Sequence, residues 1–405
     1  MTDRRTASGD AHRPGASGQV ELPKEAFLND PSGNTLLRRL LVRVLERGEG
    51  GFHLRVQGDE VQVEDLDGTV IFRGGRTWHT ILLDRLRQLA GLERSARGVV
   101  QRGRFAFGRG KDPGRLFRLS VLRGVAGEQV QVRLMPPESP PKTLEALGLT
   151  PSQAMVLRQR LARPGLVWVT GPSEEGLAST LFSLLREIPG RGRTVTIEEE
   201  VFYRSEEFLQ VETLGLTAPG RRELLRELKY LEFERIVVDR AGASSLGDLL
   251  GLAIRNRWVL AAAPAANLAG AVAELVARSR DLPLFGLNTL IHQRLVPLLC
   301  PECRTECVLG TAEREWLSRW VDPDTPLYRE GEGCSACEGR AIVGTQGFFE
   351  VLPVDERLRD ALYRASWGEG RIEDLTRSVA PTLREQIARA VSEGRVGVAE
   401  FWEVM

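Results

Sequence analysis

Residues 165–186 constrain this chain more than any other stretch, because they predict a strand, a glycine-bounded turn and a helix in immediate succession. A buried strand that runs through a Gly-rich turn into a helix is the frame of a phosphate-binding loop, whose working form reads G-x-x-x-x-G-K-[ST]. Gly171 and Gly176 stand at the two glycine positions of that pattern. Leu177 and Ala178 stand where the Lys and the hydroxyl residue belong. The loop therefore keeps the residues that shape the turn and lacks those that bind phosphate charge and Mg²⁺.

The rest of the turn also differs from a working phosphate loop. The residues that could still line a phosphate are Gly171, Pro172, Ser173, Gly176, Ser179 and Thr180. Glu174 and Glu175 add two carboxylates, and a carboxylate about 4 Å from a phosphate oxygen costs roughly 4 kcal/mol at an effective dielectric near 20. We therefore predict that the loop does not support normal Mg·ATP hydrolysis. Slow hydrolysis with unusual ligands, such as Ser179 and Asp239, is the alternative.

The chain is too long for a single core, and changes in its pattern predict two folded domains. Residues 1–33 are rich in Gly, Ser and Pro and are expected to be a disordered lead. Residues 34–135 combine amphipathic helices with short alternating strands, which predicts an α+β domain. The Pro-rich residues 136–142 are expected to be a linker. Over residues 143–405 strands and helices first alternate and short helices end the chain, which predicts an α/β domain with a mostly parallel sheet covered on both faces.

Composition excludes some partners and favours a soluble protein. Hydrophobic residues make up 42% of the chain and charged residues 27%, which is ordinary for a globular protein. The 55 basic residues balance 55 acidic ones, so net charge gives no argument for binding nucleic acid or an anionic membrane. The sequence contains no apolar run of 18 residues and does not open on a signal peptide pattern. A cytoplasmic location is therefore expected.

Four of the five cysteines form two C-x-x-C pairs. The first pair is Cys300 and Cys303, and the second is Cys334 and Cys337. Two such pairs supply the four thiolates that tetrahedral Zn²⁺ prefers, and four protein ligands make a structural site rather than a catalytic one. Four free buried cysteines are the alternative. Cys307 lies outside both pairs and is expected to be a spare thiol.

Several strings, in this order, resemble the hexameric ATPases of type II secretion and type IV pilus assembly. In the second half they are Gly171-Pro172, Thr196-Ile197-Glu198, Gln293-Arg294-Leu295-Val296, the two cysteine pairs, and Gly347-Phe348-Phe349-Glu350. In the first half they are Gln101 with Gly103-Arg104-Phe105, Arg118 with Ser120, and Gly127-Glu128. The resemblance implies a PAS-like N-terminal domain and a RecA-like P-loop domain with a zinc insert over residues 297–350. The membrane-docking domain that precedes these in the family is not recognised in this chain.

The resemblance also implies where the family's catalytic residues would stand. The Asp box, E-D-P-x-E in the family, reads Glu-Glu-Glu-Val-Phe over residues 198–202, so its last acid is replaced by Phe202. Arg240 replaces an acid on the Mg²⁺ side of the Walker B string, and an ion pair between Arg240 and Glu198–Glu200 is a further expectation. Arg257 and Pro264 replace the two histidines of the His box. The positions that depart from the family's catalytic pattern are Glu174, Leu177, Ala178, Phe202, Arg240, Arg257 and Pro264.

From these departures we expect a catalytically degenerate member that serves as a structural or regulatory subunit of a type II secretion or type IV pilus-like machine. The resemblance implies a homo-hexamer or a mixed ring with an active paralogue, in contact with inner-membrane platform proteins and peripheral to that membrane. It also implies that Arg104 and Arg118 would reach a nucleotide, although solvated charges or an ion pair are equally open readings. A subunit that binds ATP and hydrolyses it weakly is the alternative. A zinc-ribbon protein that binds nucleic acid is disfavoured, because the chain lacks a basic stripe studded with aromatic residues.

Overall fold

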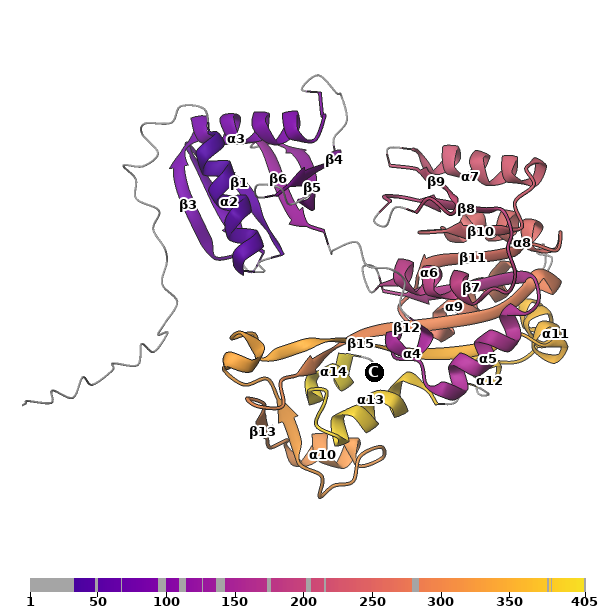
Figure 1. The fold of residues 1–405 in the computed structure, drawn as a ribbon. Helices are drawn as coiled ribbons and strands as arrows, with labels where there is room; N and C mark the ends of the chain where they lie inside the picture. Colours follow the sequence, from indigo (N-terminus) through magenta and orange to yellow (C-terminus); the bar gives the residue numbers. More distant parts are fainter. Residues whose placement is uncertain are drawn as a thin grey trace, which may run out of the picture. The chain divides into compact units, whose positions relative to one another are not determined.

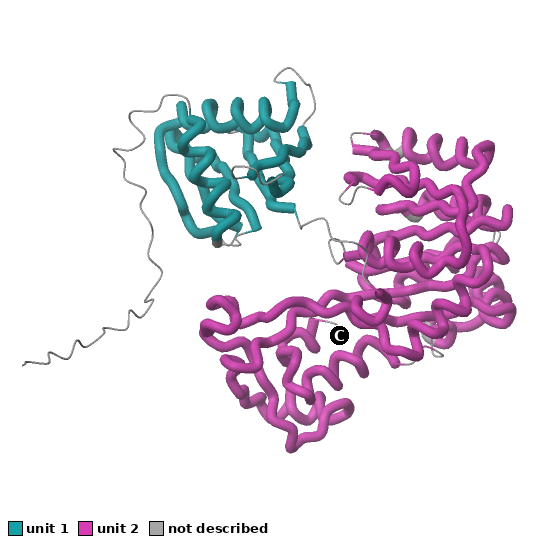
Figure 2. Tube along the Cα trace, in the orientation of Figure 1, with its two compact units in different colours: residues 1–138 teal, residues 139–405 magenta. Residues whose placement is uncertain are grey.

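The computed structural model divides into two compact units, residues 1–138 and 139–405, shown in teal and magenta in Figure 2. The residues that it describes are 33–47, 50–66, 68–93, 100–108, 114–125, 127–135, 143–172, 176–201, 205–214, 216–278, 284–376, 379 and 381–403. The linker expected over residues 136–142, and all of the expected lead except Gly33, lie outside the described residues.

The described residues of the first unit form an antiparallel sheet and the helices α2 and α3 (Figure 1). Its elements are α2 (Asn34–Arg47), β1 (Gly51–Gln57), β2 (Glu60–Asp65), β3 (Val70–Gly75), α3 (Arg76–Leu89), β4 (Val100–Phe107), β5 (Arg115–Gly124) and β6 (Gly127–Leu134). The six strands lie in the order β3-β2-β1-β6-β5-β4, and every neighbouring pair is antiparallel. The α+β architecture predicted for this part of the chain is therefore present.

Alternation along the strands builds the core of this unit. Phe52 and Leu54 of β1 are fully buried, whereas Arg55 of the same strand is exposed. Leucines at helical spacing on α2, such as Leu36 and Leu40, join the same apolar cluster. Because successive strand side chains point to opposite faces, one face of the sheet is apolar and the other is polar.

A buried ion pair ties α3 to two strands of the sheet. The guanidinium of Arg87, whose side chain is 7% exposed, donates to Glu128 Oε1 at 2.6 Å and to Gln101 Oε1 at 2.9 Å. This contact with Arg87 holds the pKa of Glu128 below its usual value of 4.5. Glu128 is therefore ionised in the folded chain and stabilises it above about pH 4.5.

The second unit contains a seven-stranded sheet and a cysteine-bearing insert. Its elements up to the insert are α4 (Leu144–Leu147), α5 (Pro151–Leu161), β7 (Gly165–Gly171), α6 (Leu177–Glu187), β8 (Thr194–Glu198), β9 (Leu209–Glu212), α7 (Ala218–Glu227), η1 (Leu228–Tyr230), β10 (Arg235–Val238), η2 (Ala243–Ser245), α8 (Leu246–Ala253), β11 (Trp258–Pro264), α9 (Leu268–Arg278), η4 (Leu284–Gly286) and β12 (Leu287–Leu299). The remaining elements are β13 (Thr305–Cys307), α10 (Thr311–Leu317), β14 (Leu327–Arg329), η5 (Ser335–Cys337), β15 (Ile342–Pro353), α11 (Glu356–Ser366), α12 (Ile372–Thr376), α13 (Leu383–Ser392) and α14 (Val398–Glu403).

The strands of this sheet lie in the order β15-β12-β7-β11-β10-β8-β9. All neighbouring pairs are parallel except β12 with β15. Val167 of β7 and Leu181 of α6 belong to the apolar cluster on one face, whereas Leu166 of β7 and Leu249 of α8 belong to the cluster on the other. The prediction of a mostly parallel sheet covered on both faces is confirmed.

The sequence did not predict the two long strands that carry the insert. β12 and β15 pair along most of their lengths, from Thr289↔Pro353 to Leu299↔Ile342. The insert expected at 297–350 therefore begins and ends inside the main sheet, and only residues 300–341 lie outside these two strands. Most of β12 is buried, and its polar and apolar residues do not alternate, so its sequence carries no pattern that would mark it as a strand. None of the described helices is long and apolar enough to cross a lipid bilayer.

We predict that Glu128→Gln lowers the stability of the full chain by about 1–3 kcal/mol, because it leaves the buried guanidinium of Arg87 without a carboxylate. Thermal unfolding at neutral pH measures this, with the exposed Glu60→Gln as the matched control. The advantage of the native chain over E128Q should shrink as the pH falls below about 4.5, where the carboxylate becomes protonated. Equal stability of E128Q and E60Q at pH 7 would contradict the assignment.

Candidate functional site

The carboxyl ends of four parallel strands meet at one edge of the second unit's sheet. Pro264, the last residue of β11, pairs with Gly171, the last of β7. Val238 at the end of β10 pairs with Ile197 near the end of β8. Polar residues that follow these strands are thereby brought to the same edge, which is where ligands bind in open α/β sheets.

The turn after β7 keeps its glycine geometry. Gly176 has a φ of 75°, in the left-handed region, and α6 begins at the next residue, Leu177. The side chain of Leu177 is partly buried against the apolar cluster under α6, and its Cδ2 would lie 3.2 Å from a Cβ placed on Gly171. The residue at the lysine position therefore packs toward the core. Ser173 and Glu174 lie outside the described residues.

The hydroxyls of α6 are not equally available. Thr180 is 2% exposed, and its Oγ1 donates to Gln293 Oε1 at 2.6 Å. Ser179 is exposed, and Ala178 carries no hydroxyl. The hydroxyl of Thr180 is therefore buried and bonded to Gln293 of β12, whereas that of Ser179 is exposed. The sequence marked Gln293 as part of a family string but did not predict this contact, because only the parallel pairing of β12 with β7 brings Gln293 beside Gly171 and α6.

An ion pair joins the residues that follow β8, where the family's Asp box was expected, to those that follow β10, where its Walker B string was expected. Arg240 Nη1 lies 3.1 Å from Glu199 Oε2, and Arg221 Nη2 of α7 lies 3.4 Å from Glu199 Oε1. The ion pair expected between Arg240 and the Glu198–Glu200 string is confirmed, with Glu199 as the partner. Arg221 was not predicted, because nothing in its own string distinguishes it from other exposed helical arginines. Phe202 lies outside the described residues.

Two further acids at this edge are poorly solvated: Glu198 is buried and Asp239 is partly buried. Glu198 Oε1 accepts hydrogen bonds from Thr196 Oγ1 at 2.6 Å and from Gln210 Nε2 at 3.0 Å. Burial raises the pKa of Glu198, and the nearby charge of Asp239 raises it further. Burial also raises the pKa of Asp239, and the charge of Glu199 adds to that rise. The edge therefore brings several acidic side chains together in a poorly solvated place. The positive charge of Arg240 offsets the repulsion among their carboxylates.

The structure separates the two residues that replace the histidines. Pro264 stands at the carboxyl edge, whereas Arg257 precedes β11 at the opposite edge, roughly 20 Å away along a strand of seven residues. The guanidinium of Arg257 donates to the carbonyl of Leu228 at 2.6 Å and to that of Lys229. Arg257 therefore contacts the end of η1 and is not part of the edge that holds the other predicted positions.

Arg104 and Arg118 lie on the polar face of the first unit's sheet. They are opposite each other on β4 and β5, and Arg118 is in turn opposite Arg133 on β6. Three arginines thus form a row across neighbouring strands. Sequence reasoning identified the first two by resemblance alone and did not include Arg133.

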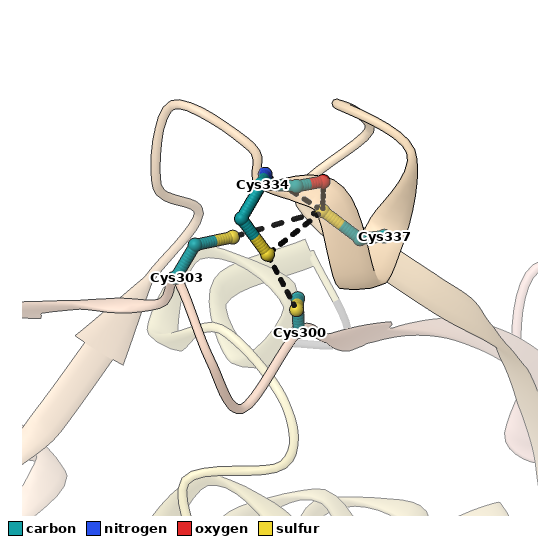
Figure 3. A group of neighbouring side chains, drawn as sticks. All are labelled: Cys300, Cys303, Cys334 and Cys337. Carbon is teal, nitrogen blue, oxygen red and sulfur yellow. Dashed lines mark hydrogen bonds between the residues drawn. The ribbon is translucent and has the colours of Figure 1, made fainter. Parts of the chain in front are cut away.

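The four predicted cysteine ligands converge at the ends of β12 and β15, as Figure 3 shows. All four Sγ atoms lie within 4.8 Å of one another, and three of their separations, including Cys300 to Cys334, are 3.8 Å. A tetrahedral site with metal–sulfur bonds near 2.3 Å requires sulfur atoms about 3.8 Å apart. The arrangement therefore fits a metal ion, and the described part of the chain contains no second group of three or more such ligands. Cys307 is not part of the group.

Backbone N–H groups prepare one of these thiols for metal binding. The N–H groups of Cys334 and Ala341 each donate to Cys337 Sγ at 3.2 Å, and these bonds lower the pKa of Cys337 to about 6. Glu338 and Ala341 adopt positive φ angles of 54° and 59°, which wind the chain around the sulfur atom. The turn therefore favours the thiolate, the form that binds metal.

Comparison with known proteins identifies the family. The model for the type II/IV secretion system protein family matches residues 31–233 and 272–403. This chain belongs to that family. The matched ranges leave out residues 234–271, which include Arg240, Arg257 and Pro264.

Relatives and solved structures agree with this assignment. The chain is 27% identical to type II secretion system protein E of Aeromonas hydrophila, over 95% of this chain and 78% of the relative. It is 25% identical to the type IV pilus assembly ATPase PilB of Myxococcus xanthus, over 88% of this chain and 63% of the relative. The Legionella pneumophila ATPase DotB shares the fold at a TM-score of 0.61 and 16% identity, over 91% of this chain and 94% of DotB. The pilus retraction motor PilT with bound ADP does so at 0.59 and 17%, over 91% and 96%.

We predict that the purified chain carries one tightly bound metal ion in an all-sulfur site. Elemental analysis by mass spectrometry should find it, and Cys337→Ser should lose most of it, because three thiolates and a hydroxyl bind a soft ion more weakly. Cys307→Ser is the matched control and should keep the metal. Full metal content in C337S, or its loss in C307S, would contradict the site.

Proposed function

We propose that this member of the secretion and pilus ATPase family does not hydrolyse ATP and serves as a structural or regulatory subunit of a type II secretion or type IV pilus-like machine. One observation carries the proposal. A guanidinium, that of Arg240, is paired with Glu199 at 3.1 Å where the family resemblance places acids on the Mg²⁺ side.

The residues around the turn do not fit Mg·ATP. In a working loop a Lys neutralises the β- and γ-phosphates and a hydroxyl binds Mg²⁺. Leu177 packs against the core, Ala178 has no hydroxyl, and the hydroxyl of Thr180 is bonded to Gln293. The loss of one aimed donor typically costs 10²- to 10³-fold in rate, and here several are replaced.

We further propose that the metal at the four cysteines is structural zinc. Four sulfur ligands near tetrahedral spacing favour Zn²⁺, and they leave no open position for water or substrate. Residues 34–135 would correspond to the family's PAS-like domain and residues 143–405 to its RecA-like domain.

The fold shared with DotB and PilT supports assembly into a ring as a working proposal. The ring would be a homo-hexamer or a mixed ring in which an active paralogue supplies the hydrolysis. It would form in the cytoplasm and contact inner-membrane platform proteins of the machine. A subunit of this kind would contribute shape and contacts rather than turnover.

We predict that the chain hydrolyses ATP at least roughly 100-fold more slowly than the type II secretion system ATPase E of Vibrio cholerae, its 26% identical relative, because the donors to phosphate and Mg²⁺ are replaced. A coupled assay on both purified proteins, each with its metal site filled, measures this.

Comparable turnover that disappears in Ser179→Ala or Asp239→Asn would overturn the proposal and favour the weak-ATPase alternative. Thermal stabilisation by ATP with Mg²⁺, measured in parallel, separates loss of binding from loss of hydrolysis.

A further inference from the structure

The edge at which β8 and β10 end holds four carboxylates, which we call the carboxylate edge. They are Glu198, Glu199, Glu200 and Asp239. Glu199 is 17% exposed, and each of its two oxygens faces a different guanidinium, Arg240 at 3.1 Å and Arg221 at 3.4 Å. Both cations therefore lie on one carboxylate in the middle of the acidic string.

The backbone aims Arg240 at this position. Its φ is 51°, in the left-handed region that only a few non-glycine residues occupy. The N–H groups on either side are fixed, since Asp239 N donates to Ile197 O at 2.9 Å and Ala241 N donates to Ala262 O at 2.6 Å. The turn is therefore held by β8 and β11, and a residue with a long cationic side chain occupies a conformation in which Gly or Asn would be less strained.

The positive charge of Arg240 offsets the repulsion among the nearby carboxylates. Carboxylates gathered at a poorly solvated edge repel one another, and a divalent cation is the usual means of holding them together. The burial of Glu198 and Glu200 makes that repulsion stronger. Arg240 supplies positive charge at the same edge from within the chain.

We propose that the guanidinium of Arg240 substitutes for a divalent cation: it holds the carboxylate edge together without metal or nucleotide, and it excludes a metal ion from these carboxylates. This inference rests on the proposed function and gives an electrostatic reason for it. Removal of the charge should therefore uncover a latent site for a hard divalent cation such as Mn²⁺ or Mg²⁺, which prefers carboxylate ligands.

The test measures Mn²⁺ binding without nucleotide, by electron paramagnetic resonance of free Mn²⁺, on the full chain with its cysteine site already loaded. Arg240→Asn removes the charge at a backbone conformation that Asn tolerates. R240N should bind Mn²⁺ roughly tenfold or more tightly than the native chain. The repulsion between a cation and one positive charge about 4 Å away, at an effective dielectric near 20, corresponds to more than a tenfold change in affinity. Mg²⁺ should compete for the site and raise the melting temperature of R240N but not that of the native chain.

Three further variants separate the proposal from a general loss of positive charge. Arg240→Lys keeps the charge and should gain no Mn²⁺ binding. Arg193→Asn removes an arginine from an exposed ion pair with Glu232 and should gain none either. Glu199→Gln combined with R240N should lose the gained site. Equal Mn²⁺ binding by the native chain and R240N, or equal gain in R240N and R193N, would overturn the proposal.

Glu199→Gln alone keeps the proposal testable if R240N does not fold. It leaves Arg240 at the edge without the carboxylate of Glu199 and should lower the melting temperature. An unchanged melting temperature would overturn the proposal that Arg240 takes the place of a cation. Failure here is distinct from failure of the proposed function. Mn²⁺ binding by the native chain without ATP turnover contradicts only the cation substitution, whereas ATP turnover by the native chain contradicts the proposed function.

Discussion

The pairing of β7 with β11 on one side and β12 on the other is the constraint on which the second unit depends. All seven residues of β7 are buried, so each of its peptide groups must find its partner in a neighbouring strand. Because these strands are parallel, their carboxyl ends emerge at one edge. The turn at Gly171, the acids after β8 and Arg240 after β10 meet there for that reason alone. The edge would form with many different side chains, and its chemistry is decided by the few that it carries.

The same pairing constrains Gly171, the first glycine of the turn. A Cβ on Gly171 would lie 2.7 Å from the carbonyl oxygen of Gln293, so β12 approaches the turn too closely for any other residue. Thr180 then bonds the side chain of the same Gln293. Packing against β12 therefore requires Gly at position 171 whether or not phosphate binds. This is why Gly171 can persist where the phosphate-binding side chains have not.

Local patterns predicted strands with one polar face and also the fully buried β7. The alternation around Phe52 and Leu54 marked a strand, and the cysteine spacing marked a metal site whose four sulfur atoms do converge. The strand β12 was not predicted, because its polar and apolar residues do not alternate and nothing in its sequence indicates its pairing. The sequence also did not predict at which end of its strand a candidate residue lies. Resemblance counted Arg257 among the positions of the catalytic pattern, yet it precedes β11 and so lies at the end of that strand opposite Pro264. Contacts between distant elements, such as Arg221 with Glu199, depend on the completed sheet and have no local signal.

The last helices of the chain complete a core that begins in its middle. Leu317 and Leu327 of the insert pack in one apolar cluster with Ile387 of α13 and Phe401 of α14, and Figure 1 shows these helices beside the β12–β15 pair. A ribosome therefore releases the insert well before it releases the helices that complete this cluster. During synthesis, Leu317 and Leu327 lack the apolar cover of α13 and α14 until those helices have left the exit tunnel. For this interval the insert depends on contacts among its own residues, such as the pairing of β13 with β14 and the convergence of the four cysteines.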